Sequence, residues 1–130
     1  GYAGMFHYNT IIPQPDHHDL ALQTAKEIEG NIIELNKKFK EEGIPEIAIG
    51  IGVNSGICIA GNFGATDRFA FSLIGDPWNI AARLESSTKV AGVGTLIGEE
   101  TAKHCSFDLK ELAPIAVKGK AKPLKVYTWK

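Results

Sequence analysis

One strand, turn and helix pattern limits what this 130-residue chain can fold into. Residues 69–74 are apolar and aromatic except for Ser72, which predicts a strand, and Gly75 ends it. Asp76 suits the N-cap of a following helix. Pro77 suits the first helical position, because its missing N–H would have no partner there anyway. The pattern therefore predicts a strand that leads directly into a helix.

Polar side chains follow one face of this predicted helix. Asp76, Asn79 and Arg83 fall at positions i, i+3 and i+7, so they lie on the same side. An amide and a guanidinium one turn apart, beside a helix N-terminus, can hold an anionic group such as a phosphate. An alternative stays open, in which Asn79 supports the helix start and Arg83 pairs with Asp76 or Glu85.

The pattern at 71–83 resembles the signature of the class III adenylate/guanylate cyclase catalytic domain of the bacterial type. That signature runs aromatic, hydroxyl or acidic, two apolar residues, Gly, a variable pair, apolar, Asn, and Arg four residues later. Residues 49–56 and 61–68 are similar to the family's central hairpin, and 117–120 with 126–127 to its closing hairpin. Because several motifs stand in the family's order, the resemblance covers most of the chain.

The resemblance implies a role for each matching residue. Arg83 looks like the arginine that stabilises the transition state, and Asn79 like the asparagine that orients the ribose. Ser72 and Leu73 stand at the purine-binding position, where a hydroxyl can donate or accept and does not by itself separate adenine from guanine. Adenine is expected, since bacterial-type members with a hydroxyl there mostly resemble adenylate cyclases. Lys118 looks like the lysine that reaches the terminal phosphates, with an exposed turn lysine as the alternative.

The metal-binding half of the site is where the chain departs from the family. The resemblance implies two Mg²⁺ or Mn²⁺ ions held by carboxylates. Tyr2 stands where the family's Gly-Asp-Ala-x-Met segment has a metal-binding aspartate, and a neutral phenol is a poor Mg²⁺ ligand. The family's first strand, two helices and a further strand, and its purine-selecting lysine have no counterpart. We therefore expect an N-terminally incomplete domain, inactive alone, whose metal ligands belong to the missing part.

The order of predicted elements indicates an α+β fold, and the resemblance adds a ferredoxin-like core with helices packed on a partly antiparallel sheet. The Asn-Ser-Gly sequence at 54–56 is a strong hairpin signal between strands at 47–53 and 57–61. This region is unusually rich in glycine, which often marks close approach of another backbone or a ligand; its glycines are Gly50, Gly52, Gly56, Gly61 and Gly64. The chain 1–130 is expected to be one partial catalytic domain. The other predicted elements are a strand within 1–9, helices at 17–42, 76–90 and from 98, strands at 95–97, 107–112, 115–117 and 124–129, and a turn at 118–121.

Charge and composition exclude several classes of protein. The formal net charge of −1 gives no electrostatic basis for binding nucleic acid or an acidic membrane surface. No apolar run approaches the ~20 residues that span a bilayer. Cys58 and Cys105 fit no metal spacing and are interpreted as reduced, buried thiols. The expected location is the cytoplasm, which includes the cytosolic domain of a larger membrane or sensor protein.

The sequence pattern indicates no function for the histidines. His17 and His18 are adjacent at a predicted helix start, so they are expected to point in different directions, to be exposed and to share no metal. His7 and His104 are expected to be isolated.

Together these features predict a nucleotide cyclase domain that converts ATP to cyclic AMP and pyrophosphate in intracellular signalling. The expected partners are ATP and a second copy of the chain, with the active site between the two subunits. Neither nucleic acid nor membrane contact is expected. Two alternatives stay open: a non-catalytic cyclase-homology module that dimerises and still binds a nucleotide, and an α+β domain that shares only the fold.

Overall fold

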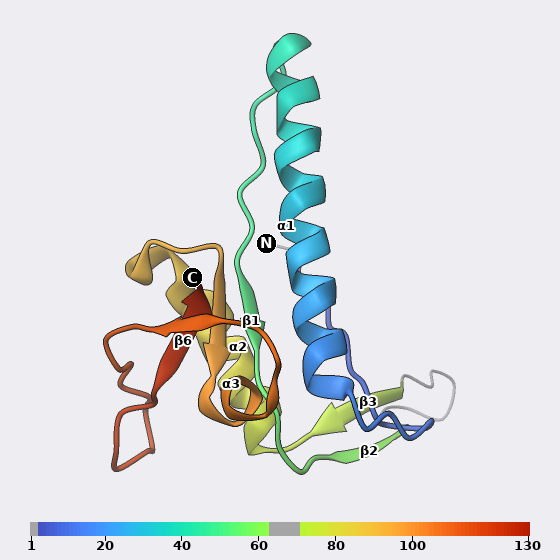
Figure 1. The fold of residues 1–130 in the computed structure, drawn as a ribbon, viewed down its shortest axis with the longest axis vertical. Coiled ribbons are helices and arrows are strands. Elements are labelled where there is room, and N and C mark those ends of the chain that lie inside the picture. Colours follow the sequence, from blue (N-terminus) through green and yellow to red (C-terminus); the bar gives the residue numbers. More distant parts are fainter. Residues whose placement is uncertain (1–2, 63–70) are drawn as a thin grey trace.

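The computed structural model of the chain describes residues 3–62 and 71–130 (Figure 1). Helix α1 fills most of the N-terminal third, and shorter helices and strands alternate after it. The elements are α1 (His17–Glu41), β1 (Ile51–Val53), β2 (Ile59–Asn62), β3 (Phe71–Ile74), α2 (Asp76–Ala91), β4 (Thr95–Gly98), α3 (Glu99–His104), β5 (Leu109–Glu111) and β6 (Val126–Trp129).

Four of these strands form a mixed sheet in the order β1-β4-β6-β5. Strand β1 is parallel to β4, whereas β4 with β6 and β5 with β6 are antiparallel. This arrangement confirms the predicted α+β fold with a partly antiparallel sheet. The predicted helices at 17–42 and 76–90 are confirmed to within one residue at their ends.

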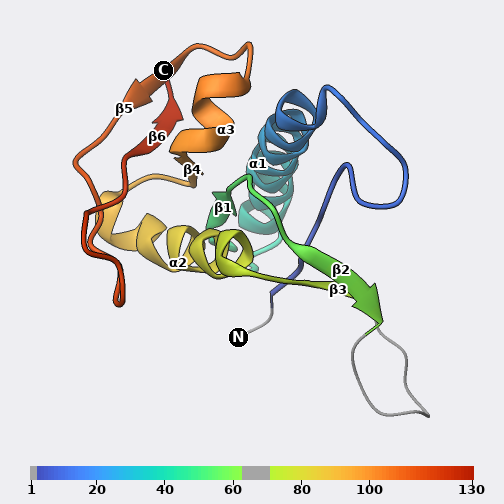
Figure 2. The same ribbon diagram turned by 90° about the horizontal axis from the view of Figure 1, so that it is seen from below.

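Strand β4 is buried along its whole length and divides the core into two parts. Ile97 packs with Leu22 of α1 on one side, and Leu96 packs with Leu84 of α2 on the other. Neighbouring strand residues point to opposite faces, so α1 and α2 cover the two faces of the sheet (Figure 2). The sheet therefore fixes where α2 lies.

Helix α2 packs closely against Gly52 of β1 and against Gly50, which directly precedes that strand, so a side chain at either position would force its neighbours to shift. A Cβ atom at Gly52 would overlap the carbonyl oxygen of Ala81 and lie 2.5 Å from the amide nitrogen of Glu85. A Cβ at Gly50 would lie 3.0 Å from the Glu85 carbonyl oxygen. The sequence-based prediction that glycines in this region mark a close approach is confirmed for a backbone at Gly50 and Gly52, and the approaching backbone is that of α2.

The predicted hairpin around residues 54–56 is wrong. Strand β1 pairs with β4, while β2 pairs antiparallel with β3 from Ile59↔Ile74 to Asn62↔Phe71. The parallel pairing with β4 places Val53 in the core, which a hairpin with the exposed strand β2 would not do. The β2–β3 pair instead forms a two-stranded ribbon that extends away from the main sheet (Figure 2).

Three smaller predictions also need correction. Residues 3–9 form no strand, and they are followed by a loop that Asn9 and Gln14 close by exchanging backbone-to-side-chain hydrogen bonds of 2.9 and 2.6 Å. Gly75 rather than Asp76 is the N-cap of α2, and its carbonyl accepts the Asn79 N–H at 3.2 Å. The predicted strand at 115–117 is reduced to the single bridge Ile115↔Leu124.

Other features agree with the sequence. The turn at 118–121 is present, with Gly119 at a φ of 86° and a 3.1 Å bond from the Lys120 N–H to the Val117 carbonyl. Within the described ranges, no helix has the length and apolar character that crossing a membrane requires.

Substituting Gly52 tests the seating of α2. Gly52→Ala should lower the free energy of unfolding by about 1–3 kcal/mol or more, because the atoms that its methyl group meets are backbone atoms that cannot move aside. Gly30→Ala is the matched control, since nothing lies within 4 Å of its Cβ position on α1. It should stabilise the protein by about 0.5–1 kcal/mol. Urea unfolding measures both, and equal effects would contradict the packing described here.

Candidate functional site

The predicted site residues Asn79 and Arg83 both lie on α2 and are both exposed. Helix α2 starts at Asp76, directly after β3 and Gly75, so both side chains lie within its first two turns. The opposite side of the helix is anchored by Leu84, which is fully buried. Their spacing of four residues places the amide and the guanidinium one helical turn apart. The structure therefore brings these two side chains together on the solvent side of α2.

The structure does not show the alternative in which Arg83 pairs with Asp76 or Glu85. Asp76 forms an ion pair with Lys120. Among the residues that the structure describes, Arg83 makes no ion pair with a carboxylate. Its guanidinium is thus available to a ligand approaching the start of α2, where the helix dipole also favours a negative charge.

The pair between Lys120 and Asp76 brings the C-terminal turn to the start of α2. This turn also carries Lys118, which is exposed. The sequence did not single out Lys120, although its place two residues after Lys118 in a tight turn could have drawn attention to it. The turn that contains Lys118 and the first turn of α2 are therefore linked by a side-chain contact.

Ser72 and Leu73 belong to β3, the strand that leads into α2. Ser72 is opposite Gly61 of β2, and Leu73 is opposite Ala60. Leu73 is half-buried. These two residues precede α2 by only a few positions, so the chain places the predicted purine-binding strand next to the helix that carries Asn79 and Arg83.

The described residues contain no cluster of metal-binding side chains for the predicted metal ions. In residues 3–62 and 71–130, no group of three or more His, Cys, Asp or Glu side chains is placed to hold a metal ion. Asp76, the acidic residue at the start of α2, is engaged by Lys120. Tyr2, which stands where the resemblance has a metal-binding aspartate, lies outside the described residues.

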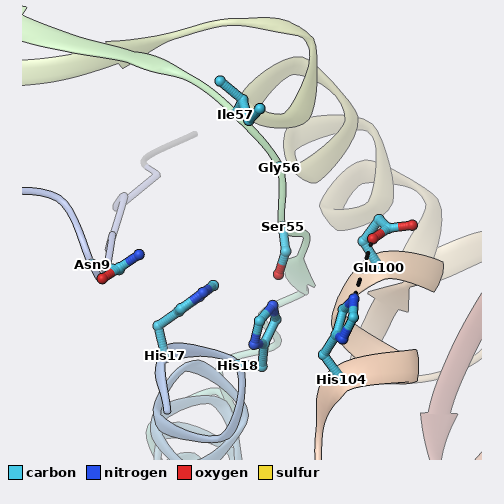
Figure 3. Close-up of a pocket in the computed structure, with 8 residues that line it drawn as sticks. All are labelled: Asn9, His17, His18, Ser55, Gly56, Ile57, Glu100 and His104. Carbon is cyan, nitrogen blue, oxygen red and sulfur yellow. Dashed lines mark ion pairs between the residues drawn. The ribbon is translucent and has the colours of Figure 1, made fainter. Parts of the chain in front are cut away.

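A separate histidine cluster lines an open cavity of about 310 Å³ between the start of α1 and the side of α3 that carries Glu100 and His104 (Figure 3). The rings of His17 and His18 have centroids 3.8 Å apart, and those of His18 and His104 are 5.0 Å apart. His104 Nε2 lies 3.6 Å from the Glu100 carboxylate. The residues lining this cavity are Asn9, His17, His18, Ser55, Gly56, Ile57, Glu100 and His104.

This cluster corrects two predictions about the histidines. His17 and His18 do not diverge into solvent but lie side by side, half-buried. His104 is not isolated, because α3 packs beside the start of α1. Only the i,i+4 spacing of Glu100 and His104 was visible in the sequence. The approach of His18 to His104 depends on tertiary packing that no local pattern announces.

The chain's relationship to known proteins follows from its sequence. The sequence model of one protein family, the adenylate and guanylate cyclase catalytic domain, matches residues 7–130. The chain belongs to this cyclase family. The resemblance seen at 71–83 is thereby confirmed, and the α+β fold is that of cyclase catalytic domains.

Two curated relatives are adenylate cyclases. The chain is 36% identical to the adenylate cyclase of Anabaena cylindrica over 90 residues, covering 65% of this chain and 18% of that protein. It is 26% identical to adenylate cyclase 1 of Rhizobium meliloti over 123 residues, covering 92% of this chain and 18% of that protein. The cyclase-family chain thus spans less than a fifth of the length of these relatives.

Solved cyclases share its structure. The adenylyl cyclase CyaB of P. aeruginosa has a TM-score of 0.77 at 30% identity, covering 87% of this chain and 58% of that chain. The guanylate cyclase domain of RhGC from Catenaria anguillulae, in complex with GTP, has a TM-score of 0.71 at 31% identity, covering 92% of this chain and 62% of that chain. Both adenylyl and guanylyl cyclases are therefore similar to it at about the same level.

The histidine cluster predicts that the stability of this cyclase-family chain depends on pH. Burial, then the neighbouring His17 and His104, lower the pKa of His18 below its ordinary 6.5, while Asp19 and Glu100 oppose the shift. The unfolded chain therefore binds a proton at His18 more readily than the folded chain does. Stability from this residue is present above pH 6.5 and is lost as the pH falls below that value.

We expect the free energy of unfolding to decrease between pH 7.5 and 5.5, and His18→Asn to flatten that decrease. Glu100→Gln should steepen it, because Glu100 raises the pKa of His18. Asp19 stays ionised over this range, since hydrogen bonds from the Ser106 backbone and side chain lower its pKa below 3.8. Urea unfolding across the range is the measurement, and an unchanged slope in His18→Asn would contradict the expectation.

Proposed function

We propose that this chain supplies the asparagine and arginine half of a nucleotide cyclase active site, in a protein that converts ATP to cyclic AMP and pyrophosphate for intracellular signalling. The observation that carries the proposal is the placement of Asn79 and Arg83 one turn apart on the exposed side of α2. Membership of the cyclase family supports it. The activity of the whole protein is part of the proposal, because the chain spans only part of its relatives.

The chemistry joins the ribose 3′-oxygen to the α-phosphorus with release of the 3′-hydroxyl proton, and it breaks the bond from that phosphorus to the pyrophosphate oxygen. Negative charge increases on the reacting phosphate, and the Arg83 guanidinium can donate two parallel hydrogen bonds to it. Asn79 can hold the ribose so that its 3′-oxygen faces the phosphorus. Lys118 can bind the terminal phosphates as a point charge, carried by the turn that Lys120 ties to Asp76.

Divalent ions, Mg²⁺ or Mn²⁺, supply charge neutralisation and activation of the nucleophile in cyclases of this class when bound. The described residues include no group of three or more His, Cys, Asp or Glu side chains placed to hold them. We propose that residues 1–130 belong to one catalytic domain larger than this chain, and that the metal ligands lie outside the residues described. The coverage of only 58% of the CyaB chain supports this proposal.

ATP is the proposed substrate. Two curated relatives carry the name adenylate cyclase, which supports adenine over guanine. The Ser72 hydroxyl is compatible with either base, because it can donate or accept a hydrogen bond. Parallel assays with ATP and GTP therefore belong in the same experiment.

A second copy of the chain is the proposed protein partner, with the active site between the subunits. The β2–β3 ribbon and the segment before it expose apolar side chains, since Ile57 is 96% exposed, Ile59 68% and Ile74 50%. A two-stranded ribbon is only marginally stable alone, and covering such side chains would stabilise it.

Cytoplasmic location is proposed as well, supported by Cys58 and Cys105, which are both free thiols.

The experiment measures cyclic nucleotide production by the longest available polypeptide that carries this sequence, with Mn²⁺ and either ATP or GTP. We expect cyclic AMP from ATP. Arg83→Ala should lower kcat by about 10²–10³-fold, the usual effect of removing one group that stabilises transition-state charge. Lys89→Ala is the matched control, because it removes an exposed cation near the other end of the same helix and should leave kcat unchanged.

The outcomes separate the alternatives. Cyclic GMP from GTP with no cyclic AMP would show that the substrate is wrong and the reaction right. No product from either nucleotide by a folded dimer would contradict the enzyme and favour a non-catalytic signalling module. Equal activity of Arg83→Ala and wild type would contradict the role of Arg83.

A further inference from the structure

We infer that Asn54 is a positioning residue that holds the first turn of α2, and with it Asn79 and Arg83, in the orientation that the reaction needs. The inference deepens the proposed function and rests on it. It comes from residues 54–56, the segment whose Asn-Ser-Gly sequence predicts a hairpin turn but which forms none. We call this segment the junction.

The Asn54 side chain connects two elements. Its Nδ2 donates a hydrogen bond of 3.1 Å to the carbonyl oxygen of Pro77, in the first turn of α2. Its Oδ1 packs against Gly98 at the end of β4, so closely that a Cβ atom at residue 98 would overlap it. Asn54 is half-buried, which shields this bond in part from competition by water. One side chain thus ties the start of α2 to the end of the central strand.

The next two junction residues make contacts of their own. The Ser55 and Thr101 hydroxyl oxygens are 2.6 Å apart, and Thr101 of α3 is fully buried. A Cβ atom at Gly56 would lie 2.9 Å from the Pro77 Cβ and would overlap the Pro77 Cγ. Three consecutive residues after β1 therefore contact α2, β4 or α3, and the junction is fixed in place by all of them.

The junction restricts sliding and rotation of α2, which the glycine packing resists only weakly. Contact of α2 with Gly50 and Gly52 sets how close the helix lies to the sheet, but van der Waals contact is non-directional and resists sliding or rotation weakly. The hydrogen bond from Asn54 to Pro77 is directional. Since Asn79 follows Pro77 by two residues, the bond acts within the same helical turn as the proposed ribose-binding amide. Losing it should let the first turn of α2 shift or fray.

Such a shift should alter turnover more than affinity. A displacement on the order of 1 Å in a catalytic group can cost about 10²-fold in rate, because the reacting atoms lose alignment. Nucleotide binding draws on more contacts than the first turn of α2, including the turn that carries Lys118. Loss of Asn54 should therefore lower kcat while leaving KM nearly unchanged.

The structural arm of the test is amide hydrogen exchange on the folded protein. Asn54→Ala should speed exchange in the first turn of α2, where the Asn79 N–H bonds the Gly75 carbonyl at 3.2 Å. Asn54→Asp keeps the shape but replaces the donor with a carboxylate oxygen facing a carbonyl, so it should have the same effect. It also keeps the test open if Asn54→Ala does not fold.

Asn36→Ala is the matched control for this arm. The Asn36 side chain also bonds backbone groups, accepting from the Ile47 N–H at 2.7 Å and donating to the Ile47 carbonyl at 2.8 Å. It lies on α1 and contacts the segment before β1 rather than α2. Its loss should destabilise the protein to a similar degree without changing exchange at the start of α2.

The catalytic arm compares kcat and KM for the same variants in the longest polypeptide that carries this sequence. Both Asn54 variants should lower kcat at least about 10-fold with KM within about twofold, and Asn36→Ala should change neither. Faster exchange with unchanged kcat would overturn the positioning role, and unchanged exchange would overturn the structural basis. A wild-type protein without cyclase activity would contradict the proposed function and the catalytic arm with it, whereas the exchange result would still decide whether Asn54 holds α2.

Discussion

The backbone of α2 lies directly on Gly52 of β1 and on Gly50 just before that strand, and the arrangement of the proposed site depends on this contact. Gly50 and Gly52 leave no side chain between strand and helix, so the Ala81 and Glu85 backbones approach the strand closely. The buried Leu84 anchors this side of α2, and Asn79 and Arg83 are left in solvent. A larger residue in β1 would push the helix outward and carry both polar side chains with it. Fold and proposed site are therefore coupled through two positions that carry no chemistry themselves.

Local patterns predicted the elements well and their pairing poorly. The apolar spacing of α1 and the Gly-Asp-Pro start of α2 depend on neighbouring residues, and both helices are where the sequence places them. The Asn-Ser-Gly signal at 54–56 is equally local, yet it fails because β1 gains more from burial beside β4 than from a hairpin. Pairing between strands far apart in the sequence is a competition between tertiary alternatives, and local residue types do not decide it.

The candidate site was also predicted only in part, because spacing within one helix is visible in the sequence and contacts between elements are not. The one-turn spacing of Asn79 and Arg83 follows from helix geometry, so the sequence predicted it. The ion pair between Asp76 and Lys120 joins residues from opposite parts of the chain, and the sequence had offered Arg83 as the partner of Asp76. The histidine cluster was missed for a similar reason, since His18 meets His104 only because α1 packs near α3. Contacts across elements, rather than motifs, explain what could not be predicted.

A complementation assay tests the central claim most directly, namely that this chain supplies Asn79 and Arg83 to an active site that forms between two subunits. The longest polypeptide that carries this sequence, with Arg83→Ala in place, is mixed with the unmodified 130-residue chain in the presence of Mn²⁺ and ATP. Alone, the Arg83→Ala polypeptide should keep at most about 1% of the wild-type kcat, and the short chain should produce no cyclic AMP. The account predicts that the mixture produces cyclic AMP, because the short chain restores the arginine across the interface. No cyclic AMP from a mixture in which the two proteins are shown to associate would contradict it.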